Sequence, residues 1–146
     1  MHRQVHHERV LVQQAGIITR AQALACGVSA DTVRRRVRAG RWRLLYRCIY
    51  LMGGHRLTDE ARVRAAWLWA QAAGAVLTGP AAAFWHGMLE RAPGAVEPTL
   101  PRAAHRTAPS GVLLRRRDGW VLGHPFAGYE IDLAFPAERV AIEVGG

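Results

Sequence analysis

Lysine is missing from this sequence: all 20 of its basic residues are arginine, against 11 acidic residues, and the net charge is +9. A balance this positive favours polyanionic partners, and the planar guanidinium group suits phosphate and guanine better than an ammonium group does. A high-GC genome accounts for the missing lysine equally well. The charge therefore indicates nucleic acid or an acidic membrane surface. The basic amphipathic helix with a bulky apolar face that a membrane surface would need is missing too.

Cysteine is scarce, with only Cys26 and Cys48 in the chain. Two cysteines without a histidine at ligand spacing do not form a zinc site, so we expect no metal and no cofactor. We expect both thiols to be reduced and buried in a cytoplasmic protein. The N-terminal residues, MHRQVHHERV, lack the apolar core of a signal peptide.

Charge is absent from residues 65–89, a stretch long enough to span a membrane. Alanine dominates it, however, and polar, glycine and proline residues interrupt it at positions 71, 74, 78–80 and 86–87. We therefore predict two buried helices and no membrane span. The first begins after Thr58, with two acidic residues in its first turn, and the second begins at Pro80. Four aromatic side chains are expected in the core: Trp67, Trp69, Phe84 and Trp85.

Residues 16–54 contain the most informative pattern. Thr19 is a candidate N-cap for a first helix, and Gly27 suits the left-handed conformation that ends such a helix. Ser29 is the next N-cap candidate, and Asp31 suits the positive end of the helix dipole. The second helix is predicted over residues 30–39, with Gly40 just beyond its end.

This second helix is amphipathic and rich in arginine. Its apolar positions are Ala30, Val33 and Val37, and at about 100° per residue Arg35 points directly away from that stripe. Asp31 and Arg38 flank Arg35, and two further arginines, Arg34 and Arg36, lie on the shoulders of the outer face. A β-hairpin follows over residues 42–52, with its break near Tyr46-Arg47-Cys48.

Helix, turn, arginine-rich helix and hairpin is the order of a winged helix-turn-helix, in which the second helix enters the major groove. Arginine can donate two hydrogen bonds to a guanine edge, while wing arginines contact phosphates. The alternative is a solvated arginine face on an ordinary helical pair. The predicted DNA-binding residues are Ser29, Asp31, Arg34, Arg35 and Arg38 on the helix, and Arg41, Arg43 and Arg47 on the wing.

The rest of the chain is rich in β-strand patterns. Short strands are predicted at residues 96–100 and 111–117, and a hairpin at residues 128–144. In that hairpin Asp132 and Glu143 lie on neighbouring strands and could hold a divalent cation, as in metal-dependent nucleases. Two acids alone are usually solvated strand residues. An endonuclease is therefore an alternative, and we expect these acids to be vestigial and the protein not to be an enzyme.

Residues 16–90 resemble the N-terminal region of AbiEi-type antitoxins. The matching phrases are GIITRAQALACGVSADTVRRRVRAGRWRLL, IYLMGG, LTDEARVRAAWL, GAVLTGPAAAFWHGM and EPTLPR. The resemblance implies DNA binding, autoregulation of an operon and neutralisation of a toxin encoded beside it. GYEIDLAFPAERVAIEV further resembles the opening of a very-short-patch-repair nuclease domain, but Gly145 stands where the next acid of that motif is expected, and we expect this part to be truncated.

We therefore expect an α+β protein with three parts: a winged helix-turn-helix at residues 1–54, a helical and β core at 55–117, and a truncated nuclease-like hairpin at 118–146. The expected partners are double-stranded DNA and a cognate toxin, with no membrane, and a homo-oligomer is left open. The competing interpretations are a degenerate metal-dependent endonuclease and a non-functional remnant of a longer gene.

Overall fold

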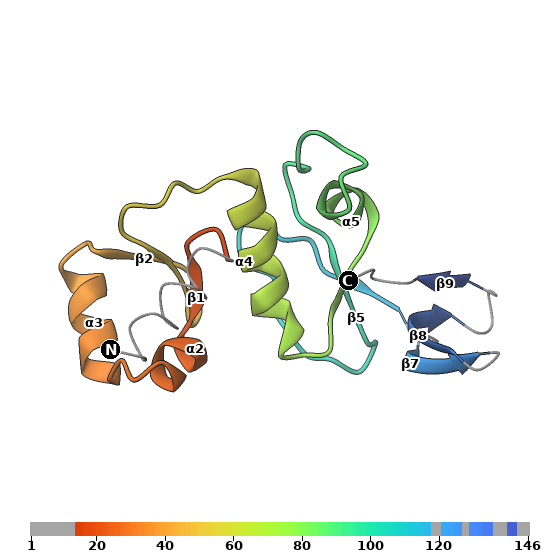
Figure 1. Ribbon diagram of the computed structural model, residues 1–146, viewed down its shortest axis with the longest axis horizontal. Coiled ribbons are helices and arrows are strands. Elements are labelled where there is room, and N and C mark those ends of the chain that lie inside the picture. The colour runs from red at the N-terminus through yellow and green to blue at the C-terminus, as the bar shows by residue number, and fades with distance from the viewer. Residues whose placement is uncertain (1–13, 118–120, 127–128, 136–139, 143–146) are drawn as a thin grey trace. The chain divides into compact units, whose positions relative to one another are not determined.

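The computed structural model describes residues 14–117, 121–126, 129–135 and 140–142, the last three ranges by backbone alone. The chain forms two compact units, Met1–Arg115 and Arg116–Gly146. Three small sheets and four helices alternate along the described chain, so the predicted α+β class is confirmed (Figure 1). The division into three parts stays a prediction.

The first helix, α2 (Arg20–Ala25), begins where the sequence predicts. Thr19 accepts a hydrogen bond from the Gln22 amide, and the Gln22 side chain accepts one from the Thr19 amide, which forms a capping box. Gly27, just past the helix, has a φ of +87°, the conformation expected for it. Immediately before α2, Ile17–Thr19 form strand β1, which was not predicted from the sequence.

The second helix, α3 (Ala30–Arg38), ends one residue earlier than predicted, with Ala39 as its C-cap. The Ser29 side chain accepts a hydrogen bond from the Thr32 amide at 3.1 Å, as expected for an N-cap. Val33 is buried and Val37 packs beside it, so the predicted apolar stripe faces inward. On the opposite face of α3, Arg34, Arg35 and Arg38 are exposed to solvent.

A hairpin of β2 (Trp42–Tyr46) and β3 (Ile49–Met52) follows, with its turn at Arg47-Cys48 as predicted. Cys48 has a φ of +64°. The third strand of this sheet is β1, which pairs antiparallel with β3, giving the order β1-β3-β2. Strand β3 is the central strand of this sheet, and all four of its residues are buried.

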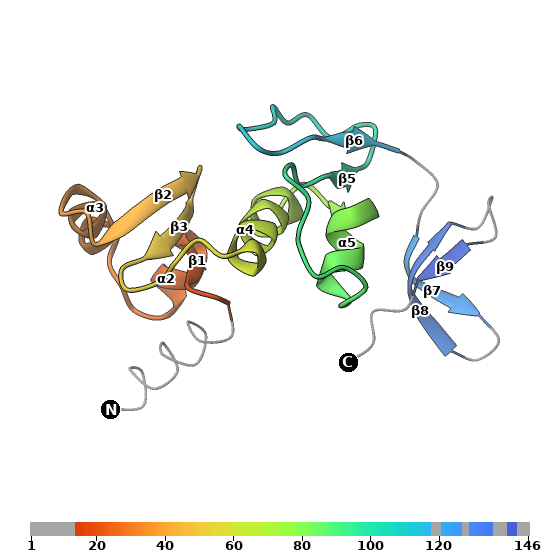
Figure 2. The same ribbon diagram turned by 90° about the horizontal axis from the view of Figure 1, so that it is seen from above.

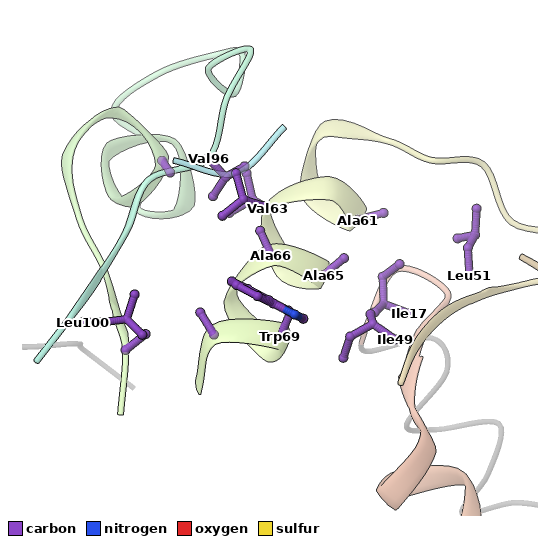
Figure 3. Close-up of a cluster of buried hydrophobic side chains, with 14 residues drawn as sticks. Ile17, Ile49, Leu51, Ala61, Val63, Ala65, Ala66, Trp69, Val96 and Leu100 are labelled. Carbon is purple, nitrogen blue, oxygen red and sulfur yellow. The ribbon is translucent and has the colours of Figure 1, made fainter. Parts of the chain in front are cut away.

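Strand β3 lies between two hydrophobic clusters, and its alternating side chains serve both. Tyr50 and Met52 pack with residues of the two preceding helices and with Trp42. Ile49 and Leu51 point the other way and pack against helix α4 (Asp59–Gln71). Figure 3 shows Ile49 and Leu51 on one side of α4, and Val96 and Leu100 on the other. Residues 16–54 thus share a core with the residues that follow them.

Helix α4 begins at the predicted place, with Thr58 capping the Ala61 amide and Asp59 and Glu60 in its first turn. It contacts strands β1 to β3 and also the next elements of the chain. These are β4 (Val76–Leu77), α5 (Gly79–Trp85) and β5 (Pro98–Leu100), and Figure 2 shows α5 and β5 beside α4. Helix α5 was predicted to begin at Pro80, and it begins one residue earlier, at Gly79.

A three-stranded sheet of order β4-β5-β6 completes this region, and the edge strand β6 (Arg115–Arg116) is shorter than predicted. The expected aromatic core is only partly correct. Trp69 is buried and Phe84 packs against the core, but Trp67 is half-buried and Trp85 is 38% exposed. Trp85 is at the C-terminal end of the short helix α5, where its ring reaches the surface beside Arg64.

The second unit contains a sheet of order β7-β8-β9: Val121–Phe126, Tyr129–Phe135 and Val140–Ile142. The predicted hairpin of β8 and β9 is confirmed, with Leu133 opposite Ile142, and β7 adds an unpredicted strand. Asp132 lies within β8, and Glu143 lies outside the described residues.

The expectation that both cysteines are buried was wrong: Cys48 is exposed at the hairpin turn and Cys26 is half-buried at the end of α2. Both are free thiols. Among the described residues, no helix is long and apolar enough to cross a membrane.

Candidate nucleic-acid interface

The exposed face of α3 carries the predicted helix residues. Ser29 and the first-turn Asp31 are exposed at its N-terminal end, and Arg34, Arg35 and Arg38 are exposed along the same helix. Since Val33 holds the opposite side in the core, this outer face is fixed in orientation. The five residues are therefore brought together on one surface.

Several short polar contacts order the N-terminal half of this face. The Ser29 hydroxyl lies 3.0 Å from the Thr32 hydroxyl, and Arg35 Nη2 lies 3.4 Å from the same Thr32 oxygen. Arg34 Nη2 donates to Asp31 Oδ1, and this hydrogen bond lowers the pKa of Asp31 below its ordinary value. Asp31 is therefore an ionised acceptor among arginines at neutral pH.

Arg36 has a different role from its neighbours. Its guanidinium carbon lies 5.0 Å from the centroid of the Trp42 ring, in a cation–π contact that joins α3 to the first strand of the hairpin. The Trp42 and Tyr50 rings are 5.7 Å apart, so the contact continues across to β3. The sequence placed Arg36 on a shoulder of the helix but gave no sign of this partner.

The three predicted wing arginines, Arg41, Arg43 and Arg47, are exposed on or beside the hairpin. Arg43 follows the buried Trp42 along β2, so it projects from the opposite face of the strand. Arg47 lies in the turn. The hairpin is anchored to the helices because the Arg20 amide donates to the Cys48 carbonyl at 2.8 Å.

A close backbone approach fixes the base of the hairpin. At Gly53 a Cβ atom would lie 2.6 Å from the Arg41 carbonyl oxygen, too close for any side chain. The Arg41 amide in turn donates to the Arg36 carbonyl at 2.9 Å. Glycine at position 53 therefore lets the chain leaving β3 pass beside the link between α3 and β2, an arrangement that the sequence alone did not indicate.

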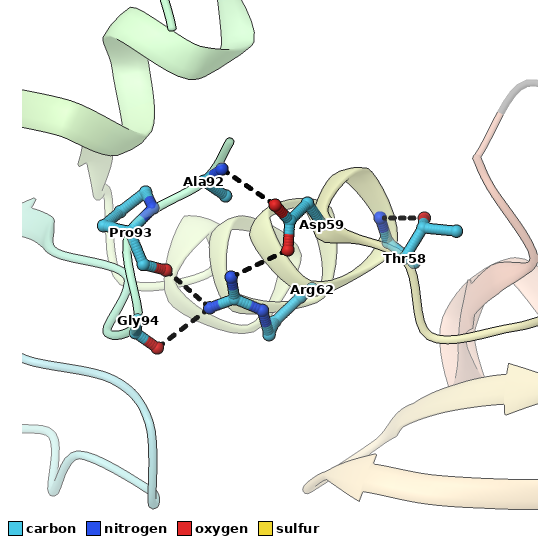
Figure 4. Close-up of polar contacts among 7 residues, drawn as sticks. Thr58, Asp59, Arg62, Ala92, Pro93 and Gly94 are labelled. Atoms are coloured by element: carbon cyan, nitrogen blue, oxygen red, sulfur yellow. Dashed lines mark hydrogen bonds and ion pairs between the residues drawn. The ribbon is translucent and has the colours of Figure 1, made fainter. Parts of the chain in front are cut away.

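A second polar cluster attaches the loop after α5 to the start of α4 (Figure 4). Asp59 accepts hydrogen bonds from the Ala92 amide at 2.9 Å and from Arg62 at 3.0 Å, and these lower its pKa. Arg62 Nη1 also donates to the carbonyls of Pro93 and Gly94 at 2.7 and 2.9 Å. Asp59 and Arg62 bond to each other and to backbone groups of the loop, so we interpret this cluster as structural.

An open pocket of about 240 Å³ lies beside this cluster. Burial raises the pKa of Tyr46 there, against an opposing effect of Arg62. The pocket lies between the hairpin, α4 and three loop segments. Its lining residues are Leu45, Tyr46, Leu57, Arg62, Ala65, Gly94, Ser110 and Gly111.

The acidic pair proposed from the sequence lies partly outside the described residues. Asp132 lies in the second unit, its partner Glu143 lies outside the described residues, and neither side chain is described. Within residues 14–117, no group of three or more metal-ligating side chains is found. The vestigial metal site therefore stays a prediction.

Comparison with known proteins bears on the same N-terminal segment. Residues 8–52 match the family model described as transcriptional regulator, AbiEi antitoxin. This range includes β1, α2, α3 and the hairpin that carries the arginines. No curated protein matches the chain, and the likeness to a nuclease domain stays a prediction. The resemblance to the AbiEi antitoxin family of transcriptional regulators is thus confirmed over residues 8–52.

Proposed function

We propose that this protein is a DNA-binding antitoxin that regulates transcription of its own operon. In this proposal, residues 16–54 act as a winged helix-turn-helix, with α3 as the recognition helix and the β2–β3 hairpin as the wing. The observation that carries the proposal is the outer face of α3, where Arg34, Arg35 and Arg38 are exposed while Val33 holds the helix to the core.

The chemistry of this face suits the major groove of B-DNA. The groove admits an α-helix, and arginine donates to O6 and N7 of guanine, the commonest specific contact. Arg41, Arg43 and Arg47 on the wing are placed to contact phosphates, which set the register of the protein on the duplex without reading sequence. The net charge of +9 supports binding to a polyanion.

Binding to the DNA upstream of the chain's own gene tests this proposal. Fluorescence anisotropy would compare the labelled upstream duplex with a scrambled duplex of the same length and composition, over a series of salt concentrations. We expect tighter binding to the upstream duplex, with an affinity that falls as salt rises because phosphate contacts release counterions. Equal binding to both duplexes would argue against a sequence-reading regulator.

The antitoxin part of the proposal is supported by the family match over residues 8–52. We expect a toxin gene beside this one, whose product arrests growth and is neutralised when this chain is co-expressed. The matched control is the chain with Arg35→Ala, which should bind its preferred DNA site more weakly but still neutralise the toxin if the two activities use different surfaces. Growth arrest that persists with every adjacent reading frame would leave a regulator without antitoxin activity.

A further inference from the structure

The exposed face of α3 contains one acidic side chain among its arginines, and it is paired. Asp31 and Arg34 form an ion pair three residues apart, and their side chains are 82% and 66% exposed. Ion pairs this exposed contribute little to folding, about 0–1 kcal/mol in general. Stability alone is therefore a weak reason to place a carboxylate on a surface that must approach phosphates.

The position of the pair suggests a role in recognition instead. Asp31 lies in the first turn of α3, the half of a recognition helix that contacts base edges. The carboxylate holds the Arg34 guanidinium on this half of the helix. A carboxylate can also accept from the amino group of cytosine, whereas every phosphate repels it.

We propose that Asp31 is a specificity-determining residue that acts with Arg34 to read a G·C base pair. Arg34 donates to the guanine edge, and Asp31 orients it. Phosphates repel the same negative charge. Binding is therefore weaker on duplexes where Asp31 finds no base edge to contact. Asp31 therefore lowers affinity for DNA in general and raises the preference for one sequence. This inference rests on the proposed DNA-binding function of α3.

A charge-neutral variant, Asp31→Asn, tests the inference. The probes are a duplex selected by the parent protein from a random-sequence pool, the same duplex with each G·C pair changed singly, and a scrambled duplex. For Asp31→Asn we expect tighter binding to the scrambled duplex and a salt dependence steeper by about 0.9 in the slope of log K against log salt. The preference for the selected duplex should fall about tenfold, with the loss concentrated at one G·C pair.

The structure provides a matched control at Glu60. Glu60 occupies the same second position of α4 that Asp31 occupies in α3, and it also pairs with an arginine, Arg64. Glu60→Gln removes the same charge from a helix outside the proposed interface, so the sequence preference should stay as in the parent. Circular dichroism and thermal unfolding of both variants would show whether either change acts through folding.

The outcomes separate the inference from the function on which it depends. If the parent selects no sequence from the pool, the proposed function itself is overturned. If the parent selects a sequence and Asp31→Asn keeps the same preference for it, Asp31 only stabilises the helix N-terminus and the inference is overturned. An equal loss of preference in Glu60→Gln would also overturn it, because net charge alone would then explain the result.

Discussion

The guanidinium group of Arg36 stacks on the indole ring of Trp42, 5.0 Å from guanidinium carbon to ring centroid. The contact joins the proposed recognition helix to the proposed wing, and it separates Arg36 from the other arginines of α3. Arg34, Arg35 and Arg38 are exposed, whereas Arg36 is half-buried. A cluster that looks uniform in sequence thus divides into one positioning residue and three residues available for a ligand.

Arg36→Ala should lower stability, because it removes the stack and uncovers the buried Trp42. The expected loss is about 0.5–1 kcal/mol, or more if the contact is well desolvated. Arg38→Ala is the matched control on the same helix and should change stability by no more than about 0.5 kcal/mol. Urea unfolding followed by tryptophan fluorescence measures both. Equal stability of the two variants would show that the stack contributes nothing.

Arg35→Ala and Arg43→Ala should affect DNA binding in different ways. If Arg35 reads a base, its loss should cost about 1–3 kcal/mol at the preferred site and relax the sequence preference. Arg43 on the wing should weaken binding to all duplexes alike and reduce the salt dependence. Anisotropy titrations with preferred and scrambled duplexes distinguish the two patterns. Unchanged binding of Arg35→Ala to the preferred site would contradict the assignment of α3 as the recognition helix.

Asp59→Asn should destabilise the protein in a pH-dependent way. The Ala92 amide and Arg62 lower the pKa of Asp59, so the ionised carboxylate stabilises the folded state above the ordinary value of 3.8. That stabilisation is lost as the pH falls through the lower pKa of the folded state. We therefore expect the melting temperatures of parent and variant to differ at neutral pH and to converge below pH 3.8.

Thr58→Ala is the control for this pH series. It removes a neutral N-cap bond to the Ala61 amide at 3.1 Å, at the same end of the same helix. The expected cost is about 1 kcal/mol, and it should not vary with pH, because no titrating group is lost. A difference between parent and Asp59→Asn that stays constant down to low pH would mean that the Asp59 contacts do not depend on its charge.

Trp69→Ala should be far more damaging than Trp85→Ala. Trp69 is 7% exposed and is enclosed by Tyr46, at a ring distance of 6.3 Å, and by Arg106, at 4.8 Å. Its removal from the hydrophobic cluster around α4 should lower the free energy of unfolding by about 3–5 kcal/mol. Trp85 is 38% exposed, so its loss should cost clearly less than the loss of Trp69. Chemical denaturation measures both, and similar costs would contradict the burial of Trp69.

We predict no nuclease activity. Cleavage of a phosphodiester needs a positioned water and a group that stabilises charge on the phosphate, beyond two carboxylates that hold a metal ion. The chain has no lysine for this role, and Gly145 stands where the related motif carries an acid. Plasmid and oligonucleotide incubation with magnesium or manganese is the measurement, with Asp132→Ala as control. Cleavage by the parent that disappears in the control would favour the endonuclease.

The sequence by itself determined where the helices begin and where the hairpin turns. Thr19 and Ser29 cap the helices that follow them, as predicted, and α4 begins after Thr58, as expected, because an N-cap depends on hydrogen bonds within four residues of the chain. The amphipathic pattern of α3 was readable for the same reason. Spacing along one helix places Val33 inside and Arg35 outside whatever the rest of the fold does.

Only the tertiary structure decided which side chains meet across elements. Residues 17–19 form a strand because they pair with the edge of β3 that β2 leaves unpaired. Strand β3 is buried on both faces because helices pack on each side of the sheet. Trp85 reaches the surface, although its place in an uncharged, alanine-rich stretch predicted a core position. Arg36 differs from its neighbours because the turn after α3 brings Trp42, six positions along the chain, against its guanidinium group. Such partners depend on how the elements pack, and no local pattern encodes that.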